Sequence, residues 1–156
     1  MKTKTEILSR KEASCRIGKC SFENTAVISF YDPVSSRTPK GYAPLDYSKV
    51  CRNVFYVPVH DIDIEILPDY GLTFETYFPE AEALARFIAE NVAAGRKIIC
   101  QCEYGQSRSA ACAAAVLEYY DKCGIDIFAD YRYYPNQLIF NKLLTALKRQ
   151  KERESE

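Results

Sequence analysis

A strand-like run, a short loop and an alanine-rich run follow one another between residues 97 and 117, and this order constrains the fold more than any other segment. The apolar run Lys97–Cys100 favours a strand, and Ala110–Leu117 favours a helix because alanine has the highest helix propensity. The loop between them reads Cys102-Glu103-Tyr104-Gly105-Gln106-Ser107-Arg108-Ser109. A strand that leads directly into a helix is typical of a sheet covered by helices, so we expect an α/β protein.

The loop combines a thiol, a glycine and an arginine in the spacing Cys-x-x-Gly-x-x-Arg-Ser. The helix that follows offers unpaired N–H groups and the positive end of its dipole, so the loop is suited to bind an anion. This setting favours the reactive thiolate of Cys102, Arg108 adds a planar cation that matches phosphate oxygens, and Gly105 gives the turn its backbone freedom. The segment therefore predicts phosphoryl transfer through a cysteinyl-phosphate, the alternative being a buried structural thiol.

The loop resembles the phosphate-binding loop of the cysteine-dependent protein tyrosine and dual-specificity phosphatases, which has the form His-Cys-x-x-Gly-x-x-Arg-[Ser/Thr], and most closely that of small bacterial predicted tyrosine phosphatases. The likeness runs from about residue 5 to 148 through the segments Ala26–Pro33, Val59–Asp63 and Tyr134–Asn136. It implies one phosphatase-like domain over residues 1–150, with a central, mostly parallel sheet of four to five strands flanked by helices, and a disordered tail over 151–156. Gln101 stands where the family usually has histidine, a departure that concerns activity rather than fold.

The resemblance also implies roles for the residues of the loop. Cys102 would be the nucleophile, Arg108 would clamp the phosphate, and Ser109 would hydrogen-bond the sulfur and ease its departure. The backbone amides between them would surround a phosphate or sulfate ion, and they belong to Glu103, Tyr104, Gly105, Gln106 and Ser107. No metal or other cofactor is implied.

Dephosphorylation also needs an acid that protonates the leaving oxygen. In the resembled families this acid is an aspartate on a loop upstream of the cysteine, which makes Asp61, Asp63 and Asp69 the candidates here. The pattern Val59-His60-Asp61 favours Asp61, whereas the dual-specificity pattern points to Asp63, and the sequence leaves the choice open.

Composition limits the partners that we expect. The chain has 156 residues, 21 basic and 21 acidic side chains and a formal net charge of zero, which argues against broad binding to nucleic acid or to a membrane surface. No run is long and apolar enough for a membrane helix, and the first residues lack the apolar core of a signal peptide, so a cytoplasmic location is expected. Because the loop has no lysine and carries Glu103, a phosphorylated protein or peptide is favoured over a phosphoinositide.

Seven cysteines and one histidine narrow the chemistry further. Without a secretory signal we expect reduced thiols. A zinc site made of Cys15, Cys20, Cys100 and Cys102 has spacings unlike those of common zinc sites. Cys100 is expected to be a buried strand thiol, the alternative being a protective disulfide with Cys102. His60 is expected to end a strand or to steady the neighbouring acid.

The rest of the chain alternates between strands and helices. Strands are expected at Ile7–Leu8, Thr25–Phe30, Asn53–Val59 and Arg96–Gln101. Helices are expected from a capping box at Ser9–Glu12 through Ile17, from Phe74 or Pro79 to Ala94, over Arg108–Lys122 with Gly124 as C-cap, and over Pro135–Arg149. Long loops are expected at 31–48 and 61–73. This alternation predicts helices on both faces of the sheet, and a ligand site at the carboxyl ends of its strands, where Cys102 lies.

Three functions from different classes therefore remain. The favoured one is a phosphoprotein phosphatase, acting on phosphotyrosine or with dual specificity. A pseudophosphatase that binds phosphopeptides without turnover is the second, and Gln101 favours it slightly. A rhodanese-like sulfurtransferase, which also carries cysteine between strand and helix, is the third. The cluster Tyr131–Tyr134 resembles a nucleic-acid stacking surface, but the neutral charge favours simple packing.

Overall fold

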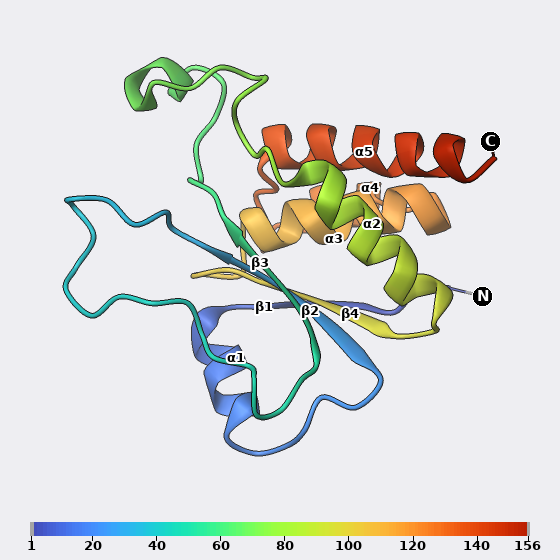
Figure 1. Ribbon diagram of the computed structural model, residues 1–156. Coiled ribbons are helices and arrows are strands. Elements are labelled where there is room, and N and C mark those ends of the chain that lie inside the picture. Colours follow the sequence, from blue (N-terminus) through green and yellow to red (C-terminus); the bar gives the residue numbers. More distant parts are fainter. Residues whose placement is uncertain (1, 156) are drawn as a thin grey trace.

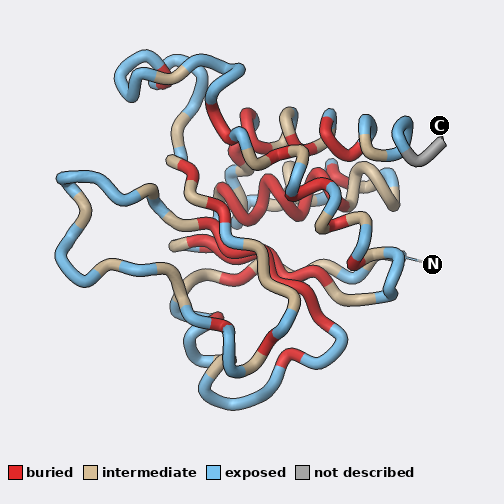
Figure 2. Tube along the Cα trace, in the orientation of Figure 1, coloured by how far each residue is buried: buried red, intermediate tan, exposed pale blue. Residues whose placement is uncertain are grey.

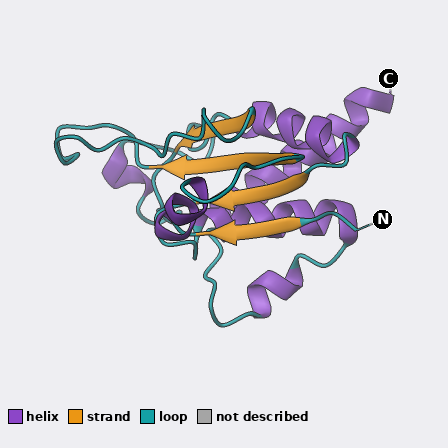
Figure 3. Ribbon diagram, turned by 90° about the horizontal axis from the view of Figure 1, so that it is seen from below, coloured by secondary structure: helices purple, strands orange, loops and turns teal. Residues whose placement is uncertain are grey.

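In the computed structural model, which describes residues 2–155, four parallel strands form one sheet. The strand order is β1-β4-β2-β3, and Figure 3 shows the four strands running in the same direction. Their bounds are β1 Thr5–Leu8, β2 Thr25–Tyr31, β3 Asn53–Pro58 and β4 Lys97–Gln101. The predicted α/β class, the parallel sheet and the four predicted strands are thereby confirmed.

Helices cover both faces of this sheet, as the alternation predicted. In Figure 1 one helix lies below the sheet and the larger helices lie above it. The helices are α1 Arg10–Ile17, α2 Ala81–Ala93, α3 Arg108–Asp121, α4 Ile125–Ala129 and α5 Gln137–Ser155, with a short 3-10 helix η1 at Leu67–Tyr70. None of the helices in the described part of the chain is long and apolar enough to cross a membrane.

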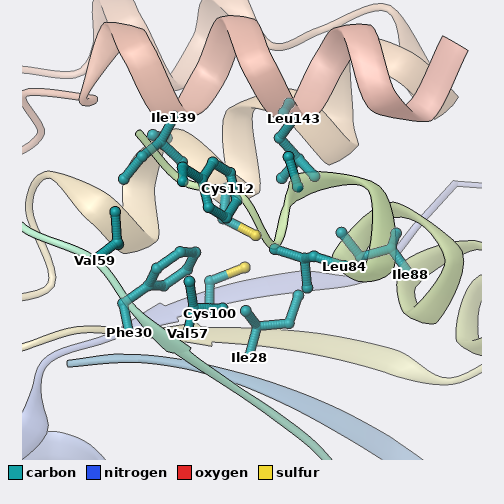
Figure 4. Close-up of a cluster of buried hydrophobic side chains, with 14 of the residues drawn as sticks. Ile28, Phe30, Val57, Val59, Leu84, Ile88, Cys100, Cys112, Ile139 and Leu143 are labelled. Carbon is teal, nitrogen blue, oxygen red and sulfur yellow. The ribbon is translucent and has the colours of Figure 1, made fainter. Parts of the chain in front are cut away.

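Alternate residues of the central strands enter two separate cores. In β2, Ile28 and Phe30 join the larger core beneath α2, α3 and α5, whereas Val27 points to the α1 face with Leu8 and Tyr47. This alternation follows from the two-residue period of a strand. Figure 2 shows the burial concentrated in the strands and α3, and Figure 4 shows the larger core.

Helix α3 is the centre of the larger core. Residues 108–116 are all buried, and most of them are alanine, so α3 can lie close to the sheet while α2 and α5 pack around it. The strand and the helix that hold the candidate loop are therefore both internal elements, and the loop between them has a rigid base.

The structure corrects two expectations about helix ends. Helix α3 ends at Asp121, and its C-cap is Lys122, which takes the left-handed conformation (φ 58°), instead of Gly124. Gly124 has φ −56° and serves close packing, because a Cβ there would lie 2.7 Å from the carbonyl oxygen of Ala114. It begins α4, which we did not predict. Helix α5 continues to Ser155 through most of the segment expected as a disordered tail, because its Lys, Glu and Arg residues are good helix formers without a glycine or proline to stop them.

Candidate active site

The loop 102–107 connects β4, an internal strand, to the first residue of α3. It packs against the start of α1, where the backbone N–H of Arg10 donates to the carbonyl oxygen of Glu103 at 3.0 Å. Gly105 has φ 68°, and a Cβ at this position would lie 2.8 Å from the backbone nitrogen of Ser9. Both the turn and the close approach therefore require glycine at this position of the motif.

Cys102 and Ser109 meet at the base of the loop. The sulfur of Cys102 lies 3.1 Å from Oγ of Ser109, and both side chains are buried. Ser109 is in the first turn of α3, so its hydroxyl approaches the sulfur from the helix N-terminus. This is the contact that the resemblance implied for the two residues.

Arg108 is a buried cation that is held from two neighbouring strand ends. Its Nη1 donates to Oδ1 of Asp32 at 2.7 Å and to the carbonyl oxygen of Val59 at 2.9 Å. These acceptors follow β2 and β3 directly in the chain. Its Nε is also buried but has no acceptor among the residues that the structure describes. A guanidinium fixed at one end with a free donor at the other is suited to bind an anion.

Asp32 belongs to the site, although the sequence analysis did not single it out. It lies at the carboxyl end of β2, and its side chain is about half exposed. In the sequence, Tyr31-Asp32-Pro33 stands out only as part of a segment that resembles the family. A carboxylate directly after a strand that neighbours β4 was the feature that could have identified it.

Gln101 is buried, and both polar atoms of its side chain form hydrogen bonds on the α1 face of the sheet. Its side-chain oxygen accepts from the hydroxyls of Ser29 (2.8 Å) and Tyr47 (2.6 Å), and its side-chain nitrogen donates to the carbonyl oxygen of Cys102 (3.1 Å). The register places Ser29 directly opposite Gln101. Burial raises the pKa of the Tyr47 hydroxyl, so this donor stays protonated over the ordinary pH range.

Asp61 is the predicted acid that the structure brings to the loop. Its Oδ1 accepts hydrogen bonds from Oγ of Ser107 at 2.7 Å and from Nδ2 of Asn136 at 3.0 Å. Asn136 also donates its backbone N–H to the carbonyl oxygen of Ser107, and the N–H of Tyr134 donates to Gln106. The segments Val59–Asp63 and Tyr134–Asn136, which both resemble the family, therefore meet the loop at this point.

The other two candidate acids and the histidine lie in different surroundings. Oδ1 of Asp63 accepts from the backbone N–H groups of Glu65 and Ile66, as in a turn. Asp69 is exposed in the first turn of η1. The ring of His60 packs against Tyr70, with 4.6 Å between the ring centroids.

A cleft of about 430 Å³ opens above the loop. Its walls come from the segment 32–42, from residues 60–62 with Tyr70, and from Glu103, Tyr104 and Arg108. Of the loop residues that we expected at the substrate, Tyr104 is 77% exposed, so its ring stands at the mouth. The cleft is large enough for a phosphorylated side chain.

The remaining cysteines lie apart from this chemistry. Cys100 is a buried strand thiol, as predicted, and Figure 4 shows its sulfur facing that of Cys112 in the larger core. Burial, and then the hydrogen bond with Cys100, raise the pKa of the Cys112 thiol well above its usual range. Cys15 and Cys20 are exposed. Within residues 2–155, no group of three or more His, Cys, Asp or Glu side chains is arranged to hold a metal ion.

Comparison with known proteins identifies the fold. No protein-family model and no curated protein matches this sequence. Among solved structures, PTPMT1 in complex with PI(5)P is similar with a TM-score of 0.56 and 14% identity, over 97% of this chain and 94% of that one. Human DUSP28 is similar with a TM-score of 0.50 and 18% identity, over 96% and 94% of the two chains. The chain thus has the fold of the protein tyrosine and dual-specificity phosphatases. The narrower likeness to bacterial enzymes stays a prediction.

Proposed function

We propose that this protein is a phosphatase that hydrolyses phosphorylated protein or peptide, on tyrosine or with dual specificity, through a cysteinyl-phosphate on Cys102. The observation that carries the proposal is the hydrogen bonding of the Arg108 side chain. Two protein acceptors hold its Nη1 while its buried Nε has no acceptor in the described chain, directly beside the start of α3. Such a buried, unmatched donor fits a bound phosphate oxygen, because a buried donor without an acceptor costs free energy.

In the first step, the thiolate of Cys102 attacks phosphorus. An S–P bond forms while the bond from phosphorus to the leaving oxygen breaks, and that oxygen takes a proton from the carboxyl group of Asp61. Arg108 and the N–H groups at the start of α3 hold the non-bridging oxygens, whose charge increases in the transition state.

In the second step, water attacks the phosphorus of the cysteinyl-phosphate. The carboxylate of Asp61 takes a proton from this water, an O–P bond forms, and the S–P bond breaks to release the thiolate and inorganic phosphate. The Oγ of Ser109, 3.1 Å from the sulfur, donates a hydrogen bond to the departing thiolate.

The position of Asp61 supports its role as the acid over that of Asp63. Asp61 lines the cleft together with Arg108 and contacts Ser107 of the loop, whereas the carboxylate of Asp63 accepts hydrogen bonds from two backbone amides of its own turn. An acid must reach the leaving oxygen before its pKa matters.

The test is hydrolysis of para-nitrophenyl phosphate by the wild type and by Cys102→Ser, with the exposed Cys15→Ser as the matched control. We expect activity in the wild type and in Cys15→Ser and none in Cys102→Ser. Rapid acid quenching should trap one phosphoryl group on Cys102. A wild type that binds phosphate without turnover would identify a pseudophosphatase, and thiocyanate formation from thiosulfate and cyanide would identify a sulfurtransferase. Either result would refute the proposal.

A further inference from the structure

A second groove, of about 720 Å³, lies beside the candidate active site. It runs between the segment 61–66 and the start of α5, and we call it the flanking groove. Besides Asp61 and Ser107, its lining includes Asp63, Ile64, Glu65, Phe74 and Tyr134. Because Asp61 and Ser107 also belong to the candidate active site, the groove continues directly from the place where a phosphate would bind.

Large apolar side chains in this groove are exposed to solvent. Ile64 is 62% exposed, Phe74 42% and Tyr134 72%. Single exposed apolar residues are ordinary on protein surfaces, but a group of them along one groove marks a binding surface. Its continuity with the loop indicates that the ligand is the part of a substrate next to the phosphorylated residue.

The charged side chains that line the groove are all acidic. Asp61, Asp63 and Glu65 line it, and no lysine or arginine does. None of these three carboxylates forms a salt bridge with another described residue, and Asp61 and Asp63 accept hydrogen bonds from neutral hydroxyl, amide and backbone N–H donors. The three carboxylates therefore give the lining of the groove a negative charge, which acts on whatever occupies it.

We infer that the flanking groove binds the polypeptide on one side of the phosphorylated residue, and that it selects sequences with lysine or arginine next to an apolar residue. The inference rests on the proposed function and specifies its substrate class. Carboxylates attract a basic side chain and the apolar walls bind its neighbour, whereas an additional phosphate would be repelled. A phosphoinositide, such as the PI(5)P bound to PTPMT1, carries that additional charge and fits this groove less well.

The test compares two phosphotyrosine peptides that differ only in their flank, Lys-Leu-Lys against Glu-Leu-Glu, with the enzyme in its wild-type form. Because exposed ion pairs are individually weak and screened by salt, we expect about a tenfold higher kcat/KM for the basic peptide, and we expect this ratio to fall towards unity in high salt. Glu65→Lys should lower this ratio at least several-fold. Glu90→Lys makes the same change of charge at an exposed position of α2 outside the groove, and should leave the ratio unchanged.

Two further measurements separate failure of this inference from failure of the proposed function. Para-nitrophenyl phosphate reports on the chemistry alone, and the affinity of Cys102→Ser for the two peptides reports on the groove even without turnover. Equal kcat/KM values for the two peptides, together with equal affinities of Cys102→Ser for them, would overturn the inference. A ratio of kcat/KM values in Glu65→Lys equal to that of the wild type would overturn it as well. Hydrolysis of PI(5)P with a higher kcat/KM than the basic peptide would overturn it as well. Inactivity towards all phosphates, with the basic peptide still bound more tightly, would overturn only the proposed function.

Discussion

The side-chain amide of Gln101 donates a hydrogen bond to the carbonyl oxygen of Cys102, so the residue before the proposed nucleophile holds the backbone of that nucleophile. The oxygen of the same amide is fixed by hydroxyl groups from Ser29 on β2 and from Tyr47 on the loop before β3. Two donors on the oxygen leave only the nitrogen for Cys102, which determines the orientation of the amide. An amide does not titrate, so this support is independent of pH, unlike that of a histidine at the same place.

Replacing Gln101 should therefore weaken both the fold and the proposed activity. Gln101→Leu leaves two buried hydroxyls without an acceptor, so we expect the free energy of unfolding to fall by about 2–4 kcal/mol. Tyr47→Phe removes one hydrogen bond and should cost only about 1 kcal/mol. Urea denaturation followed by circular dichroism measures both. Gln101→His, which offers an N–H to the carbonyl of Cys102, should retain more aryl phosphatase activity than Gln101→Leu. Wild-type activity in both Gln101 variants would contradict a positioning role.

Asp32 should act on the substrate through the orientation of Arg108. Asp32→Ala removes an acceptor from Nη1, so the guanidinium loses a charge-assisted bond and we expect KM for an aryl phosphate to rise about tenfold. Asp32→Asn keeps a side-chain oxygen in the same place and removes the charge, so its KM should change less than about threefold. Steady-state kinetics at one pH distinguishes the two variants. An equally large rise in KM for Asp32→Asn and Asp32→Ala would show that Arg108 needs the charge of Asp32 and not only an acceptor at this place.

The identity of the general acid can be decided by two conservative variants. We expect Asp61→Asn to lower kcat by about 100-fold with phenyl phosphate, because a general acid contributes roughly two to four orders of magnitude. The loss should be smaller with para-nitrophenyl phosphate, whose leaving group needs less protonation. Asp63→Asn should stay within about threefold of the wild type, since it perturbs a turn rather than the proton transfer. The reverse pattern would assign the acid to Asp63.

Much of the fold could be predicted because the signals were local. The capping box of α1 forms as expected, with Ser9 accepting from the N–H of Glu12 and Glu12 accepting from the N–H of Ser9. Helix α4 was missed because its stability depends on tertiary contacts, such as the packing of Phe128 on Phe140 from α5 at 4.9 Å between centroids. Gly124 was misassigned for a related reason, since its role becomes apparent only where Ala114 approaches it.

In the candidate site, too, contacts between residues close in the sequence could be predicted, and contacts between distant residues could not. Cys102, Arg108 and Ser109 are close in the sequence, so their proximity could be predicted. Asp32 lies 76 residues before Arg108, and their contact follows from the position of β2 between β4 and β3, a strand order that periodicity does not specify. The network of Gln101 likewise depends on the register that pairs it with Ser29. Sequence patterns identify reactive groups more readily than the groups that orient them.

Ser109 should affect the second chemical step more than the first. In Ser109→Ala the departing thiolate loses its hydroxyl donor, a charge-assisted bond worth about 1.5–3 kcal/mol, so kcat should fall by at least about tenfold. The value of kcat/KM, which reports on steps up to the first phosphoryl transfer, should change much less. Stopped-flow assays should then show a burst of released phenol, and quenching should show accumulated cysteinyl-phosphate. An equal fall in kcat and kcat/KM without a burst would place the role of Ser109 in the first step.

Glu6 should make the stability of the sheet depend on pH. This residue of β1 accepts from Arg16 of α1 at 2.6 and 2.7 Å and from Lys97 of β4. The hydrogen bond with Arg16, followed by that with Lys97, lowers the pKa of Glu6 from 4.5 to about 2 against the opposing effect of burial. Because the folded state has the lower pKa, the carboxylate stabilises the protein fully above the pKa of the unfolded chain, and this contribution is lost as the pH falls from about 4.5 to about 2.

Glu6→Gln is the variant that measures this contribution. The partners of Glu6 are about one third exposed, so screening limits the effect and we expect the free energy of unfolding at pH 7 to fall by about 1–2 kcal/mol. The difference from the wild type should shrink as the pH falls towards 2. Glu82→Gln, which breaks the more exposed pair with Arg149, is the control and should change stability by less than about 0.5 kcal/mol. A difference in the free energy of unfolding between wild type and Glu6→Gln that stays constant from pH 7 to pH 2 would contradict the prediction. It would show that the ion pairs of Glu6 with Arg16 and Lys97 do not couple β1 to α1 and β4.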